Sequence, residues 1–129
     1  MLLEIKDLCA GYGDLQVLFN ISMNVDEGEV VSLVGSNGAG KTTLLRILSG
    51  LEPVKSGTIT YRGEDLTRIK AYEKADHRIA HIPQGRGILG SLSVRENLVM
   101  GAYPKAARAA LEENIQKSFE MFPILKERQ

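Results

Sequence analysis

A short glycine-rich segment carries the residue types best suited to chemistry, and it fits the pattern G-x-x-x-x-G-K-[S/T] at every fixed position. Glycines allow a tight backbone curl, so that main-chain N–H groups converge on phosphate oxygens. Lys41 would place its ammonium on the β- and γ-phosphates, and the Thr42 hydroxyl is a ligand for a bridging Mg²⁺. We therefore predict a triphosphate site whose members are Gly35, Ser36, Asn37, Gly38, Ala39, Gly40, Lys41, Thr42 and Thr43.

Two flanking elements would hold this loop in place. Val30–Val34 is nearly all apolar and rich in β-branched residues, which predicts a central strand of a parallel sheet, covered on both faces. Lys41–Ser49 predicts a helix that ends at Gly50. The positive end of the helix dipole would then face the phosphates.

The remaining elements follow from apolar periodicity and turn residues. Alternation predicts strands around Leu3–Ile5 and Ile21–Val25, with a loop at Gly11–Asp14 between them. Ser56–Gly57 predicts a turn before a strand. Further predicted elements are strands over 58–61 and 78–82 and helices over 70–77 and 105–122.

Composition excludes several classes of protein. The chain has 129 residues, 43% hydrophobic and 25% charged, which excludes a disordered tail or a fibre. Its 16 basic and 16 acidic residues cancel, which argues against binding nucleic acid through a bulk positive field. The single cysteine, Cys9, favours a reducing compartment. No run approaches the ~20 apolar residues of a membrane helix, and no secretory leader is expected, so the sequence predicts a cytoplasmic protein.

Segment 35–43 resembles the Walker A loop of ABC-type ATPases, and three further segments resemble that family in the same order. They are Tyr12 within Gly11–Gly13, the segment Ser56–Ile59, and the Q-loop Ile82–Gln84 followed by Leu92–Leu98. The resemblance covers residues 1–125. It implies an α/β fold of the P-loop NTPase class, as a fragment of an ABC-type nucleotide-binding domain. That fragment would comprise N-terminal antiparallel strands, the Walker A strand-loop-helix and the start of a helical subdomain.

The same resemblance implies roles for residues outside the loop. Tyr12 would stack on adenine, and Val17 would add an apolar contact. Gln84 would contact Mg²⁺ or its bound water, sense the γ-phosphate and, together with Lys41, supply the catalytic groups. The implied ligands are ATP and Mg²⁺. The implied partners are transmembrane permease subunits and a second ATPase subunit, and no nucleic acid, with the protein held peripherally on the inner face of the plasma membrane.

Three segments indicate a subfamily. Ile82–Gly87, Glu96–Ala102 and Phe122–Arg128 resemble the ATPase subunit of branched-chain amino acid importers and of their urea or short-chain amide relatives. Gln84 stands where that subfamily usually has Glu, and the subfamily's Phe-Pro or Phe-Ser pair is missing near Leu89–Gly90. These departures leave the transported substrate open.

The resemblance also predicts a division of the chain. Residues 1–83 would form the nucleotide-binding core, 84–104 the Q-loop region, and 105–129 the start of the helical subdomain. The signature, Walker B, D-loop and switch-histidine segments of the family do not occur in 1–129, and His77 and His81 are expected to be surface or packing residues. We expect 1–129 alone to bind ATP without hydrolysing it, because no carboxylate is placed to orient water.

Other interpretations stay open at this stage. Val30–Val34 would lack parallel neighbours, which predicts association between chains. The helix ending near Phe122 could dock on a permease, although core packing is the favoured role. The alternatives to a transporter ATPase are an ABC-like ATPase of DNA repair or chromosome maintenance and a nucleotide sensor without turnover.

Overall fold

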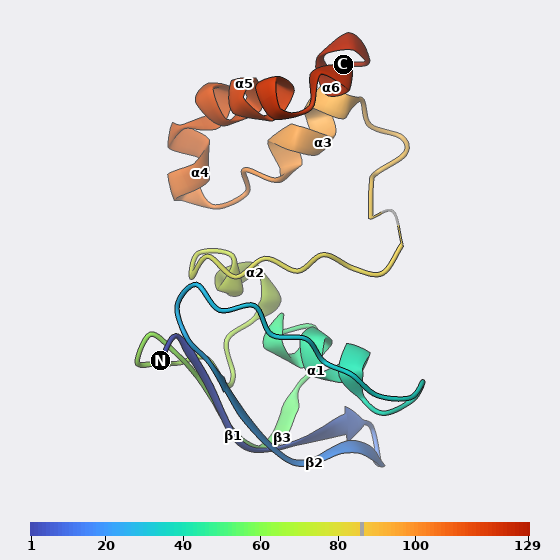
Figure 1. The fold of residues 1–129 in the computed structure, drawn as a ribbon, viewed down its shortest axis with the longest axis vertical. Helices are drawn as coiled ribbons and strands as arrows, with labels where there is room; N and C mark the ends of the chain where they lie inside the picture. The colour runs from blue at the N-terminus through green and yellow to red at the C-terminus, as the bar shows by residue number, and fades with distance from the viewer. Residues whose placement is uncertain (86) are drawn as a thin grey trace. The chain divides into compact units, whose positions relative to one another are not determined.

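The computed structural model describes residues 1–85 and 87–129, which form two compact units, Met1–His81 and Ile82–Gln129. Figure 1 shows a sheet with short helices in the first unit and helices alone in the second. Because the two units are not placed relative to each other, each is described by itself.

The first unit is built on a four-stranded antiparallel sheet in the order β2-β1-β3-β4. Its strands are β1 (Leu3–Tyr12), β2 (Leu15–Val25), β3 (Val54–Tyr61) and β4 (Glu64–Asp65). A tight turn at Gly13 and Asp14, with Gly13 at φ +54°, joins β1 to β2. The alternating segments of the sequence therefore do form strands, and β1 and β2 extend well beyond the predicted bounds.

Helix α1 (Lys41–Leu48) packs its buried side chains against this sheet, and it begins and ends close to the predicted bounds. Leu44 and Ile47 lie three residues apart, on one face of the helix, and both are buried. They join a core whose other members are Ile5, Leu8, Ala10, Leu18, Ile59 and Leu66. The core thus fixes the helix that follows the glycine-rich loop.

The predicted turn at Ser56–Gly57 is wrong, because both residues lie inside β3. Gly57 has φ +88°, and the β1–β3 register shifts between Lys6 and Cys9, opposite this position. A Cβ on Gly57 would lie 2.5 Å from the carbonyl oxygens of Lys6 and Asp7. The glycine therefore marks a β-bulge, where two backbones approach closely, rather than a chain reversal.

The strand predicted over Val30–Val34 does not form. Val30 is 93% exposed and Val34 is 94% exposed, and the segment pairs with no strand in the part of the chain that the structure describes. A buried parallel strand needs ladder partners and apolar cover on both faces, and the antiparallel sheet supplies neither here. Segment 78–82 also forms no strand, and Ile82 is 91% exposed.

This exposed segment leads us to expect that residues 1–129 associate in solution. Val30→Lys with Val34→Lys should reduce association, since each buried valine contributes about 1.5–3 kcal/mol and a lysine resists burial. Sedimentation velocity over a concentration series measures it. Met121→Lys, which alters another exposed apolar residue at 71% exposure, is the control. A wild-type chain that stays monomeric throughout would contradict the expectation.

Helix α2 (Ala71–Lys74) completes the first unit and is shorter than the predicted 70–77. Its Lys74 is 2% exposed, and this burial lowers the pKa of its ammonium. The second unit holds α3 (Val94–Met100), α4 (Lys105–Ala109), α5 (Leu111–Met121) and α6 (Pro123–Glu127). Within the described ranges no helix is long and apolar enough to cross a bilayer.

The single helix predicted over 105–122 is instead two helices. The backbone leaves the helical region at Ala110, with φ −113° and ψ 23°. Residues 106–110 are mostly alanine and have little apolar area to bury, whereas α5 buries Ile115 and Phe119. The apolar stripe of the sequence is thus a packing face inside the second unit at those two positions.

Candidate functional site

The glycine-rich loop turns twice through left-handed backbone before helix α1. Gly38 has φ +84° and Gly40 has φ +93°, conformations that glycine adopts without strain. The N–H of Ala39 donates to the Ser36 carbonyl at 3.1 Å, which closes the curl. The loop therefore has the tight geometry that the sequence predicts for residues 35–40.

Lys41 folds back over the start of the loop. Its Nζ donates to the Gly35 carbonyl at 2.6 Å and to the Ser36 carbonyl at 2.7 Å. A lysine ammonium has three N–H donors, so one remains for an anion beside the loop. The two carbonyl contacts hold the charge of Lys41 at the loop.

The positive end of the helix dipole, at the first turn of α1, is not neutralised by any side chain of that turn or its N-cap. Its N-cap is Gly40, which makes no side-chain cap hydrogen bond, and the turn contains no acidic residue. The first intrahelical bond at this end runs from the Leu44 N–H to the Gly40 carbonyl at 2.9 Å, so the N–H groups of residues 41–43 have no intrahelical acceptor. Such an end favours an anion by about 0.3–1 kcal/mol.

Strand β2 supports the loop from one side. A Cβ on Gly40 would lie 2.6 Å from Leu18 Cδ2 and 3.3 Å from Val17 Cγ1, so the backbone of Gly40 packs directly on these side chains. A Cβ on Gly38 would meet nothing within 4 Å. The loop is therefore backed by β2 at Gly40 and open at Gly38. Val17 lies beside the loop, while Leu18 is a supporting residue that the motif does not indicate.

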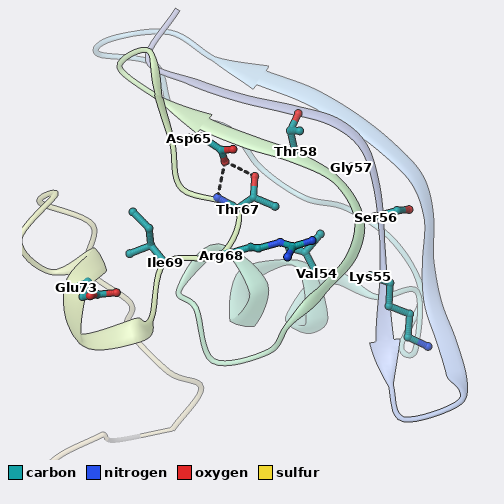
Figure 2. Close-up of a pocket in the computed structure, with 10 residues that line it drawn as sticks. All are labelled: Val54, Lys55, Ser56, Gly57, Thr58, Asp65, Thr67, Arg68, Ile69 and Glu73. Atoms are coloured by element: carbon teal, nitrogen blue, oxygen red, sulfur yellow. Dashed lines mark hydrogen bonds between the residues drawn. The ribbon is translucent and has the colours of Figure 1, made fainter.

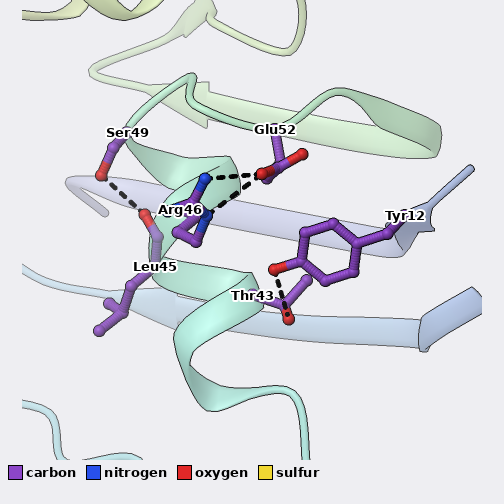
Figure 3. A network of polar contacts seen from close by, with 6 residues as sticks. All are labelled: Tyr12, Thr43, Leu45, Arg46, Ser49 and Glu52. Atoms are coloured by element: carbon purple, nitrogen blue, oxygen red, sulfur yellow. Dashed lines mark hydrogen bonds and ion pairs between the residues drawn. The ribbon is translucent and has the colours of Figure 1, made fainter.

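Tyr12 reaches helix α1 from the end of β1. Its Oη lies 3.2 Å from Thr43 Oγ1, across 31 positions of sequence, and Figure 3 shows the ring extending from β1 to this contact. Tyr12 is 42% exposed, whereas Thr43 is 6% exposed. The structure thus brings the predicted aromatic residue to the first turn of α1 and directs the Thr43 hydroxyl toward it.

No pattern in the sequence predicts the ion pair that lies beside this contact. Arg46 donates from Nε at 3.2 Å and from Nη2 at 2.7 Å to the same oxygen, Oε1 of Glu52 (Figure 3). The hydrogen bond to the Glu52 carboxylate raises the pKa of Arg46. The pair ties the last turn of α1 to the segment that enters β3.

The donor set of the loop fits a magnesium-bound polyphosphate. Lys41 and the uncompensated helix end supply positive charge, and Thr42 is exposed with a hydroxyl of the kind that binds Mg²⁺. Gln84 belongs to the second unit, where it is exposed, and its role stays a prediction. Arg86, part of the segment 82–87 used for the subfamily resemblance, lies outside the described residues.

A separate cavity of about 450 Å³ lies between β3 and the segment after β4, and Figure 2 shows its lining. Two carboxylates line it, Asp65 and Glu73. Asp65 accepts hydrogen bonds from both the N–H and the hydroxyl of Thr67, and these bonds hold the pKa of Asp65 below its usual range. Glu73 accepts a hydrogen bond from the Lys70 N–H at 3.0 Å. Arg68 extends across the cavity toward Val54 (Figure 2). Both carboxylates are thus already bonded to neighbouring groups of the chain, unlike the helix end at the loop.

Comparisons with known proteins indicate one family. The family described as ABC transporter matches residues 18–129. The high-affinity branched-chain amino acid transport ATP-binding protein BraG of Pseudomonas aeruginosa is 41% identical over 117 residues, which is 91% of this chain and 50% of that protein. The phosphonates import ATP-binding protein PhnC of Fusobacterium nucleatum is 41% identical over 101 residues, 77% of this chain and 41% of that protein.

A solved structure, described as the ATP binding subunit of an ABC transporter, has the same fold. It superposes with a TM-score of 0.79 at 31% identity, over 99% of this chain and 52% of that one. The chain thus spans about half the length, or less, of the relatives it matches. The α/β P-loop fold class is confirmed, although the strand before the loop is not formed in this structure.

Proposed function

The chain belongs to the ABC transporter family, and from this membership we propose that it binds ATP with Mg²⁺ as part of an ATPase subunit that energises transmembrane transport. The observation that supports the proposal most directly is the loop itself. Its left-handed glycines, its uncompensated helix end and the ammonium of Lys41 gather positive charge at one place.

The predicted site residues would divide the ligand between them. Lys41 and the N–H groups of Gly38–Thr43 would hold the polyphosphate, and Thr42 would hold Mg²⁺, which would supply positive charge to offset the negative charge of the phosphates. Tyr12 would present its ring to adenine, with Val17 as an apolar neighbour. Gln84 would contact Mg²⁺ or its bound water.

The transported substrate and the partners are also part of the proposal. The names of the relatives refer to branched-chain amino acids in one case and to phosphonates in the other. We favour branched-chain amino acids or related small amides, because segments 96–102 and 122–128 resemble that subfamily. The partners would be permease subunits in the membrane and a second ATPase subunit, with the chain on the cytoplasmic face.

Calorimetric titration of residues 1–129 with Mg-ATP tests the nucleotide proposal. Several charge-assisted bonds together predict a Kd on the order of 1 μM, or roughly −8 kcal/mol. AMP should bind far more weakly, because it lacks the β- and γ-phosphates that Lys41 would contact. A folded chain that releases no heat with Mg-ATP, or that binds AMP equally well, would contradict the proposal.

A further inference from the structure

We propose that Thr43 is a positioning residue, whose buried hydroxyl holds the Tyr12 phenol so that the ring presents a defined face to a nucleobase. This inference rests on the proposed nucleotide-binding function and adds to it separate roles for the backbone and the side chain of Thr43. The backbone N–H of Thr43 would serve the phosphates, while its side chain serves the aromatic ring.

The burial of Thr43 supports these separate roles. Thr43 is 6% exposed, so solvent and ligands have little access to its hydroxyl, and that hydroxyl lies 3.2 Å from Tyr12 Oη. A buried hydroxyl needs a hydrogen-bond partner, because burying it unsatisfied is unfavourable. Tyr12 supplies the partner. The Thr43 side chain is therefore directed toward the ring rather than toward the open side of the loop.

The geometry at Tyr12 shows what the contact restrains. Tyr12 is the last residue of β1, directly before the turn at Gly13–Asp14. Its side chain is 42% exposed even though its hydroxyl end is tied to α1 (Figure 3). A ring anchored at its hydroxyl and otherwise accessible loses rotamer freedom before a ligand arrives. Less entropy is then lost on stacking.

The helix that carries Thr43 is itself held in place. Leu44 and Ile47 pack in the core, and Arg46, three residues after Thr43, is bonded to Glu52. Thr43 is also within the first turn that follows Gly40. The hydroxyl therefore links the orientation of the ring to the same rigid element that begins at the phosphate loop, which would set the distance between base and phosphates.

Tyr12→Phe keeps the ring and removes only the hydroxyl, and Thr43→Val removes the other partner while keeping the backbone. Each should weaken Mg-ATP binding by about two- to tenfold, the range of one net hydrogen bond. The double variant should lose no more than the larger single loss, because both changes remove one shared contact. Thr43→Ser, which keeps a hydroxyl, should restore most of the affinity, and Tyr72→Phe, at an exposed tyrosine of α2, is the control.

Titration with inorganic tripolyphosphate distinguishes a failure of this inference from a failure of the proposed function. If Thr43 acts through the ring, the losses should appear with ATP and not with tripolyphosphate, which has no base. Equal losses with both ligands in Thr43→Val, or strictly additive losses in the double variant, would overturn the inference while leaving phosphate binding intact. A wild-type chain that binds neither ligand would instead overturn the proposed function. Melting temperatures of all variants establish that they are folded.

Discussion

Replacing Lys41 with alanine is expected to weaken Mg-ATP binding by about 100-fold, which corresponds to roughly 2.8 kcal/mol. Lys41 is held over the loop by the carbonyls of Gly35 and Ser36, and its remaining donor would meet the polyphosphate. Charge-assisted hydrogen bonds contribute about 1.5–3 kcal/mol, so a loss of this size needs only one or two of them. Calorimetric titration with Mg-ATP measures the change.

A lysine outside the loop provides the matched control for this experiment. Lys105 is exposed at the start of α4, so Lys105→Ala removes the same charge without touching segment 35–43. Its affinity for Mg-ATP should equal that of the wild type. Lys41→Arg should not restore binding, because the planar guanidinium cannot occupy the place of a compact ammonium. An unchanged Kd in Lys41→Ala would remove Lys41 from the site.

Replacing Gly57 with alanine is expected to destabilise the first unit by about 2–5 kcal/mol. The backbone at φ +88° costs about 1–2 kcal/mol for a residue with a Cβ. The new Cβ would also lie 2.5 Å from two carbonyl oxygens of β1, and relieving such overlap costs about 1–3 kcal/mol more. Urea unfolding followed by circular dichroism should show a lower midpoint of the transition.

Gly63 separates the two causes of this destabilisation. Its φ of +84° is close to that of Gly57, but a Cβ on Gly63 would meet nothing within 4 Å. Gly63→Ala should therefore cost only the backbone term, about 1–2 kcal/mol. If Gly57→Ala and Gly63→Ala lowered the unfolding free energy equally, the close approach of β1 and β3 would not constrain residue 57.

Local structural features were predicted well from the sequence. The fixed spacing of Gly35, Gly40 and Lys41 requires a curl followed by a helix, and both are present. Alternation at Leu3–Ile5 and Ile21–Val25 correctly indicated two strands. These features depend on backbone conformations and periods within a few residues, which a single segment of sequence specifies.

Features that depend on neighbours were predicted less well. Val30–Val34 has the composition of a buried strand, yet a strand exists only where a ladder partner and cover are present, and this segment has neither in the described part of the chain. Ser56–Gly57 has the composition of a turn, but both residues lie in β3, opposite a β-bulge at which the backbone of β1 comes close to Gly57. Ala110 interrupts a helix that periodicity alone would continue.

The chemistry of the loop follows from local sequence, because the types and spacing of residues 35–42 are enough to gather N–H groups and an ammonium at one point. The surroundings of that point depend on how the whole chain folds. Folding places Leu18 behind Gly40 and the phenol of Tyr12 against the hydroxyl of Thr43. Such contacts join positions far apart in the chain, and packing of the whole core sets them, so no local pattern of residue types encodes them.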